Sequence, residues 1–292
     1  MVDPSVNPWT GRIHFYRNIG DINNPILELE DTEFLGTDLG TDLSIVFGDL
    51  NADGVKNIKD ALDVHSWFCD GVDNDGNGKI DDLIGWDMGG YTGSGDNDPY
   101  PKEGVLNELN GWHHGTHVAG VLCASTNNNI GMAATSYAGK IMSIKCAIDT
   151  ESEDDPSIHG GYDGILYAAQ MGHSVGMRTI INCSWGGSGY NEYEQSVINV
   201  AYNNYGAIIV AAAGNGIEGS NEEEYAPHYP SSYDNVLSIS PVKCGGEWGK
   251  WATYHPTVDL AAPGEGIFST LINANGTVRY GELTGSSMAS PN

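Results

Sequence analysis

An unbroken apolar run at residues 207–213, with the letters A-I-I-V-A-A-A, most constrains the fold of this chain. Such a run is typical of a strand that is covered on both faces, because a half-exposed strand alternates apolar and polar residues. Gly214-Asn215 follow the run, where a turn is expected. The sequence therefore predicts a buried strand with other elements packed on both of its sides.

Strand and helix patterns alternate around this run. Further strands are predicted at 140–148, 179–183, 236–240 and 258–261, and helices at 160–172 and from Asn191 to just before Gly206. In the second helix, Asn191 and Glu194 have the spacing of a capping box, and Tyr193, Val197 and Ala201 are expected on the buried face. This alternation predicts an α/β fold, a three-layer sandwich with a mostly parallel central sheet flanked by helices.

Three separate motifs carry candidate catalytic groups. Ser287 lies in a small-residue loop, G-S-S-M-A-S-P at 285–291, and the free N–H groups of a helix starting there would face a developing oxyanion. A serine needs a base, and His114 in H-G-T-H-V-A-G at 114–120 is the candidate. Asn215, after the buried strand, can donate to the oxyanion alongside the Ser287 N–H.

These motifs, in the order His, Asn, Ser, resemble those of the subtilisin-like serine peptidases, the subtilases, from about residue 70 to the end of the chain. The family usually has Thr in place of Ser286. The resemblance implies a serine endopeptidase that cleaves polypeptides through an acyl-enzyme on Ser287, with His114 as acid and base and Asn215 in the oxyanion hole. It also implies a secreted protein. The substrate-binding segment that it implies comprises Ser184, Trp185, Gly186, Gly187 and Gly214, whose exposed backbone would pair with an extended peptide.

The acidic member of the triad is the least defined part of the site. The family motif, a strand followed by D-T-G or D-S-G, is absent; Asp49, after a strand expected at 44–47, is the first candidate and Asp31 the second. Residues 49–60 also resemble a dockerin-type calcium loop, and an Asp49 bound to Ca²⁺ could not orient His114. A non-catalytic calcium-binding module with the same fold is therefore the alternative function.

A second acidic loop predicts a structural calcium site, because hard cations favour oxygen donors at alternating positions. It is similar to a D-G-N-G stretch between the acid and histidine motifs of many secreted subtilases. The expected ligands are Asp73, Asp75, Asn77, Asp81 and Asp82.

Two other kinds of site are disfavoured. His113 and His117 have the spacing of zinc ligands, but such a metalloprotease motif needs Glu where His114 stands, and His117 is expected to be a buried structural residue. An α/β-hydrolase esterase is disfavoured because no G-x-S-x-G motif surrounds Ser287.

The composition limits the partners. A net charge of -27, from 39 acidic and 12 basic residues, argues against nucleic acid or anionic membranes as partners. No stretch approaches the roughly 20 apolar residues of a membrane span. Residues 1–42 lack periodicity and a signal peptide, and we expect an N-terminal extension or propeptide remnant there, followed by the peptidase domain at 43–292. The chain stops directly after the serine motif, so we expect a domain incomplete at its C-terminus.

Overall fold

Two compact units make up the chain in the computed structural model, Met1–Ile45 and Val46–Asn292. The first unit is described only at an antiparallel strand pair, β1 (Phe15–Asn18) and β2 (Leu27–Asp31). In the second unit the structure describes residues 70–73, 75–91, 93–101, 113–137, 139–149, 158–217, 222–273 and 278–292. Asp49 lies outside the described residues. The boundary expected after residue 42 stays a prediction.

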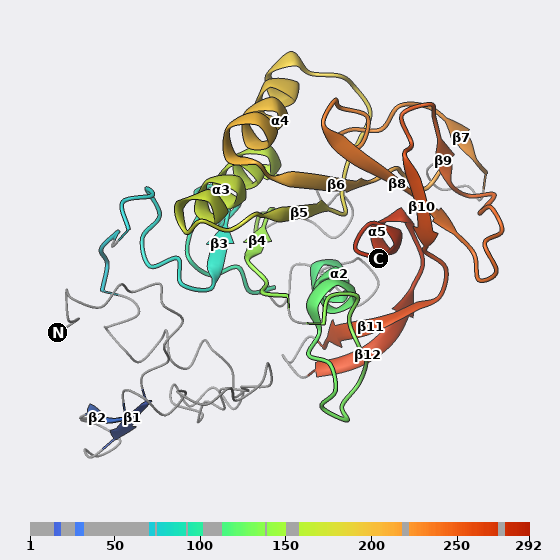
Figure 1. The fold of residues 1–292 in the computed structure, drawn as a ribbon. Coiled ribbons are helices and arrows are strands. Elements are labelled where there is room, and N and C mark those ends of the chain that lie inside the picture. The colour runs from blue at the N-terminus through green and yellow to red at the C-terminus, as the bar shows by residue number, and fades with distance from the viewer. Residues whose placement is uncertain are drawn as a thin grey trace. The chain divides into compact units, whose positions relative to one another are not determined.

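A four-stranded parallel sheet forms the centre of the second unit (Figure 1). Its strands are β5 (Ile180–Cys183), β6 (Ile208–Ala212), β8 (Val236–Val242) and β10 (Leu260–Pro263), in the spatial order β10-β8-β6-β5. Cys183 pairs with Ala211, so β5 and β6 end side by side. The apolar run therefore forms an inner strand, as the sequence predicts. A second parallel pair joins β3 (Gly85–Asp87) to β4 (Ser143–Lys145).

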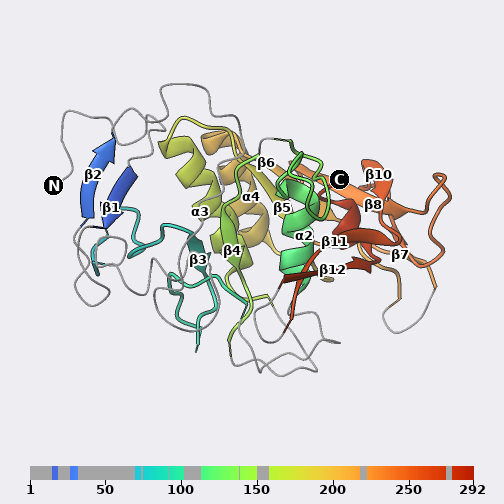
Figure 2. The same ribbon diagram turned by 90° about the horizontal axis from the view of Figure 1, so that it is seen from below.

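Helices cover both faces of this sheet. Figures 1 and 2 show α3 (Gly161–Ser174) and α4 (Glu192–Tyr205) on one side and α2 (His114–Cys123) on the other, where Figure 1 also shows α5 (Ser286–Ala289). Side chains of α3, α4 and β6 meet in one core, which includes Ile165, Ile198, Ala201 and Ile209. The predicted α/β sandwich is confirmed. Within the described residues, no helix has both the length and the apolar character that a bilayer crossing requires.

Helix α4 begins and ends where the sequence predicts, but its first turn differs from the expectation. The Asn191 side chain accepts a hydrogen bond from the Tyr193 N–H, and Gly206 ends the helix with φ 68°. Glu194 does not close a capping box directly; the Tyr233 hydroxyl accepts from the Asn191 N–H and donates to the Glu194 carboxylate. Tyr193 is 65% exposed, so its predicted burial is wrong; the buried residues of α4 are Gln195, Val197, Ile198 and Ala201.

A hairpin fixes helix α2. Strand β11 (Ile267–Ile272) packs against it and pairs antiparallel with β12 (Val278–Leu283). His117 is fully buried and its Nε2 lies 2.9 Å from the carbonyl oxygen of Ile267, which confirms a structural role. The Ser269 hydroxyl donates to the His117 carbonyl. Strand β12 continues into the serine loop, while the short strands β7 (Glu224–Tyr225) and β9 (Thr253–Tyr254) pair beyond the sheet.

Candidate active site

The serine loop packs onto the end of β5. Ser287 is half-buried between the buried residues Ser286 and Met288, so its hydroxyl remains accessible. In the structure this hydroxyl donates to the Ser184 carbonyl over 3.2 Å. In return, the Ser184 hydroxyl donates to the Ser287 carbonyl over 2.7 Å, with Ser290 Oγ 2.9 Å away. These bonds fix the backbone that carries the candidate nucleophile.

Asn215 lies against the same loop with a defined amide orientation. Its Oδ1 accepts from the Ser286 N–H at 2.8 Å and from the Ser286 hydroxyl at 2.9 Å. A backbone N–H only donates, so the oxygen must face Ser286 and the amide nitrogen must face away. Asn215 is exposed, and its Nδ2 forms no hydrogen bond within the described part of the chain. The amide nitrogen is therefore free to donate to a ligand.

Helix α2 carries His114 at its first position and contacts α5, which carries Ser287 (Figures 1 and 2). Burial, with smaller contributions from His117 and His113, lowers the pKa of His114 to about 4. The ring is thus neutral and able to accept a proton at neutral pH. No hydrogen bond joins His114 to Ser287 among the described contacts.

The predicted substrate segment follows β5, and its residues differ in whether their backbone groups already have hydrogen-bond partners. Trp185 stacks edge-on against Tyr162, with ring centroids 5.5 Å apart. Gly187 donates to and accepts from the backbone of Tyr229, at 2.8 Å in both cases. Gly186 is exposed, and its backbone has no partner among the described residues. Of the two glycines, Gly186 is the one available to an added peptide strand.

Comparison with known protein families agrees with this arrangement of the three motifs. The model of the subtilase family matches residues 87–292, which includes all the elements around Ser287, His114 and Asn215. The chain belongs to the subtilase family. This agrees with the resemblance carried by its three motifs.

Several curated proteases are similar to this subtilase. Thermitase of Thermoactinomyces vulgaris is 36% identical over 72% of this chain and 66% of its own length. The extracellular basic protease of Dichelobacter nodosus is 34% identical over 70% and 32%, and the major intracellular serine protease of Bacillus subtilis is 34% identical over 65% and 54%. The chain thus spans less than two thirds of the length of each of these relatives.

Solved structures agree on the fold. A structure of proteases from Pseudoalteromonas arctica superposes with a TM-score of 0.57 at 29% identity, covering 72% of this chain and 68% of that one. Sphericase superposes with a TM-score of 0.53 at 25% identity, covering 70% and 66%. Both matches fit the parallel sheet and its two helix layers.

The predicted calcium loop of this subtilase is bonded largely to itself. The Asp73 carboxylate accepts from the N–H groups of Gly76, Asn77 and Gly78, and the bond from Gly78 is the main reason that the pKa of Asp73 is lowered. The Asn77 amide donates to Asp75 and Asp82. Asn77 thus links Asp73, Asp75 and Asp82 by hydrogen bonds. Asp81 instead accepts from the N–H groups of Asp70 and Gly71, at the start of the loop.

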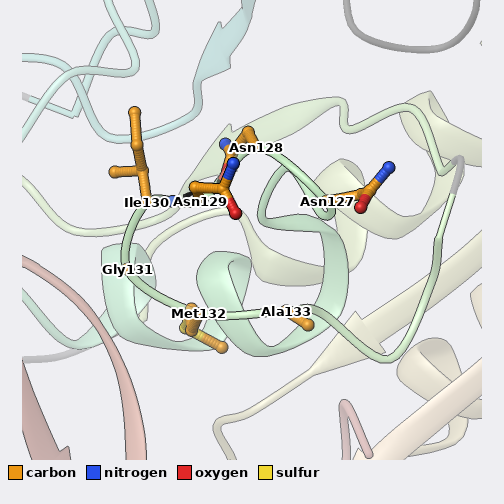
Figure 3. A pocket seen from close by; sticks show the side chains of 7 residues that line it. All are labelled: Asn127, Asn128, Asn129, Ile130, Gly131, Met132 and Ala133. Carbon is orange, nitrogen blue, oxygen red and sulfur yellow. Dashed lines mark hydrogen bonds between the residues drawn. The ribbon is translucent and has the colours of Figure 1, made fainter.

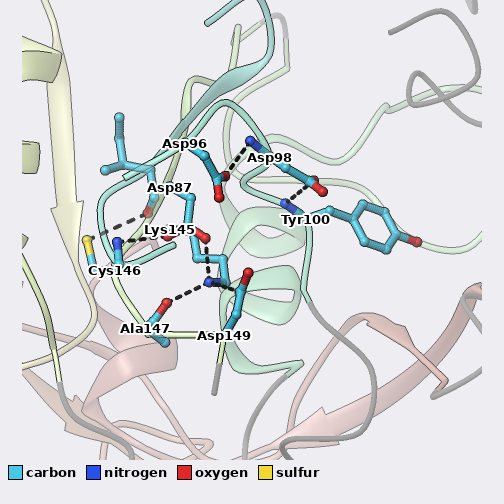
Figure 4. Close-up of polar contacts among 10 residues, drawn as sticks. Asp87, Asp96, Asp98, Tyr100, Lys145, Cys146, Ala147 and Asp149 are labelled. Atoms are coloured by element: carbon cyan, nitrogen blue, oxygen red, sulfur yellow. Dashed lines mark hydrogen bonds and ion pairs between the residues drawn. The ribbon is translucent and has the colours of Figure 1, made fainter. Parts of the chain in front are cut away.

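A different acidic cluster, which no sequence motif indicates, lies at β3 and β4 (Figure 4). Asp87 is fully buried, and its carboxylate lies 2.7 Å from Lys145 Nζ. The same ammonium group contacts Asp149 at 2.7 Å and the Ala147 carbonyl at 2.6 Å. Burial opposes the charge on Lys145, but hydrogen bonds to Asp149 and Asp87 outweigh it, and the pKa of Lys145 is raised. Lys145 therefore acts as the internal counter-ion of this cluster.

A pocket at the end of α2 is separate from these groups. It is lined by the loop from Asn127 to Ala133 (Figure 3). The loop turns through left-handed conformations at Asn127, Asn129 and Gly131, and Asn128 Oδ1 accepts from the Ile130 N–H. His114 stands at the opposite end of α2, so the pocket does not belong to the candidate active site.

Proposed function

We propose that this subtilase is a serine endopeptidase that hydrolyses polypeptides through an acyl-enzyme on Ser287. The observation that supports this best is the contact between two distant segments, in which Asn215 Oδ1 is held by Ser286 directly beside Ser287. A nucleophile must also be reached by its substrate, and Ser287 is only half-buried although its neighbours Ser286 and Met288 are buried.

In the proposed reaction, Ser287 Oγ forms a bond to the carbonyl carbon of the scissile peptide. His114 takes the serine proton and then delivers it to the leaving amine as the C–N bond breaks. The carbonyl oxygen becomes an oxyanion, and the Asn215 amide and the Ser287 N–H donate to it. Water then attacks the acyl-enzyme with His114 again as the base, which releases the acid and restores Ser287. Asp49 is proposed to orient the imidazole and to stabilise its charged form.

The substrate is proposed to lie as an extended strand along the segment after β5. Gly186 would pair with the peptide backbone, whereas Gly187 is already paired with Tyr229. Ser184 and Trp185 would contact the same strand from the β5 side, and Gly214 from the β6 side. A peptide bound in this way places its carbonyl group between Ser287 and Asn215.

A structural Ca²⁺ in the loop around Asp73 is a further part of this proposal. Partial burial raises the pKa of Asp75, and the nearby carboxylates of Asp82 and Asp73 add to the effect. A divalent cation bound by Asp73, Asp75, Asn77 and Asp82 would remove this repulsion. Addition of a chelator should then lower the melting temperature, and Asp75→Asn should reduce that response. We also propose secretion, which agrees with the extracellular relatives, and a propeptide in residues 1–42.

Labelling with a fluorophosphonate tests the catalytic proposal. The folded protein should be modified at Ser287, and His114→Ala should suppress the reaction because the serine loses its base. Ser287→Ala is the matched negative control. A folded protein that is not labelled at Ser287 would favour the non-catalytic alternative and refute the peptidase function.

A further inference from the structure

Two glycines follow neighbouring strands beside the proposed active site. Gly186 follows β5, and Gly214 follows the neighbouring strand β6. If a substrate carbonyl lies between Ser287 and Asn215, as proposed above, the side chain on its acyl side would enter the space between these two segments. Because neither glycine carries a side chain, a slot could open there, and its depth depends on what else occupies it.

The imidazole of His228 occupies this position. A Cβ added to Gly186 would lie 2.4 Å from both His228 Cε1 and the Tyr229 carbonyl oxygen, and a Cβ added to Gly214 would lie 2.6 Å from Thr253 Oγ1 and 3.3 Å from His228 Cδ2. The ring therefore lies against the backbone of both glycines. A side chain longer than a methyl group would meet the ring before it could extend between them.

The ring is also fixed in place. Its Nδ1 lies 3.2 Å from the Ala212 carbonyl oxygen, which accepts a hydrogen bond. The backbone of His228 is bonded to Ser232 in both directions, at 3.1 Å from its own N–H and 2.7 Å to its carbonyl, and the Ser231 hydroxyl donates to the same carbonyl. Moving the imidazole aside would break the bond to Ala212, so a large substrate side chain cannot displace it without cost.

We propose that His228 closes the subsite for the residue whose carbonyl carbon Ser287 attacks, so that the enzyme accepts a short side chain there and rejects an aromatic one. The inference rests on the proposed peptidase function and names its substrate class. Cleavage should follow alanine or serine, whereas phenylalanine and tyrosine should be poor at that position. His228 acts by excluding volume and takes no part in the chemical steps.

Two peptide anilides that differ only in the residue before the scissile bond, alanine or phenylalanine, test the proposal. For the unmodified protein, kcat/KM should be higher for the alanine substrate by about tenfold or more. His228→Gly should raise kcat/KM for the phenylalanine substrate by a similar factor and change the alanine value little. His228→Ala, which keeps Cβ, is the second variant in case the glycine variant does not fold. His173→Ala is the matched control, because His173 is exposed on α3.

The possible results separate the two proposals. Equal rates for both substrates, or an unchanged preference in the folded His228 variants, would overturn the role of His228 and leave the peptidase function intact. If the folded protein is labelled at Ser287, the test of His228 rests on the substrate preference alone. A folded protein that cleaves neither substrate and is not labelled at Ser287 would refute the peptidase function, and the subsite with it.

Discussion

Two polar networks in this subtilase are equally well bonded and differ in what they leave unused. The network at the ends of β5 and β6 consists of neutral groups, the hydroxyls of Ser184 and Ser286 and the amide of Asn215. The network at β3 and β4 consists of charges, with Lys145 between Asp87 and Asp149. In the neutral network, the Asn215 amide nitrogen has no partner among the described residues, and the half-buried Ser287 hydroxyl donates to the Ser184 carbonyl over 3.2 Å. In the charged network, the ammonium donates to two carboxylates and one carbonyl.

The difference follows from the cost of burial. A buried charge must be compensated within the protein, because an unpaired one costs several kcal/mol. A neutral amide can have its oxygen paired within the protein and still keep its N–H donors for a substrate. A buried network of hydrogen bonds therefore does not by itself indicate a functional site. The unpaired amide nitrogen of Asn215 is the donor that we propose for catalysis, and the following experiments should separate the two networks.

The largest expected effect concerns His114 and its proposed acid. Burial holds the pKa of His114 at about 4, and a neighbouring carboxylate would raise it by stabilising the imidazolium. Protonated His114 cannot act as base, so activity falls as the pH drops through this pKa. Asp49→Asn should lower kcat/KM at pH 7 by about 10⁴-fold and move the acid limb of the pH profile down toward 4. Profiles of kcat/KM for both proteins check this. If the limb stays in place, Asp49 is not the partner, and Asp31→Asn is the control that identifies the second candidate.

Removal of the oxyanion donor should affect activity and spare stability. Asn215→Leu keeps the approximate size of the side chain and removes the amide. The expected loss in kcat is about 10²–10³-fold, a magnitude known from a member of this family, with little change in KM. Steady-state kinetics and thermal melting of the same samples give both readouts. A rise in KM with unchanged kcat would contradict an oxyanion role.

The charged network should respond in the opposite way. Lys145→Met keeps the apolar stem and removes the ammonium group, which leaves the fully buried Asp87 without its counter-ion. The free energy of unfolding should fall by about 3–5 kcal/mol. Urea denaturation measures this change, and active-site titration with a fluorophosphonate normalises kcat to folded protein. An unchanged stability would show that the cluster is not structural, and a lower kcat per folded molecule would connect it to catalysis.

Local patterns predicted the scaffold of this chain better than its contacts. The apolar run at 207–213 identified an inner strand, and Asn191 and Gly206 marked both ends of α4, because these signals depend on neighbours in sequence. Tyr193 was wrongly predicted to be buried, because the exposure of a side chain in the first turn of a helix depends on what packs against that turn. Tyr233 bonds to this helix from a distant loop, and no local pattern indicates such a contact.

The candidate site shows the same limit. The ends of parallel strands meet at one edge of a sheet, so the proximity of Ser184, Asn215 and Ser287 could be expected from strand and motif order. The Lys145 cluster could not be expected, because it joins β3 to β4 through side chains with no motif of their own. His228 was also missed, since it lies in a loop whose course only the folded chain defines.

The smallest expected effect concerns the orientation of Asn215. The Ser286 hydroxyl donates to Asn215 Oδ1 at 2.9 Å and accepts from the Gly214 N–H at 3.2 Å, so it links the oxyanion donor to the β6 segment. Ser286→Ala removes this link, while the Ser286 N–H still holds the amide oxygen. We expect kcat to fall about tenfold, the equivalent of one hydrogen bond, with KM nearly unchanged. Ser286→Thr keeps the hydroxyl and is the matched control, which should retain most of the activity. Equal losses in both variants would mean that packing at this buried position, rather than the hydroxyl, sets the rate, and would remove Ser286 from the group that positions Asn215.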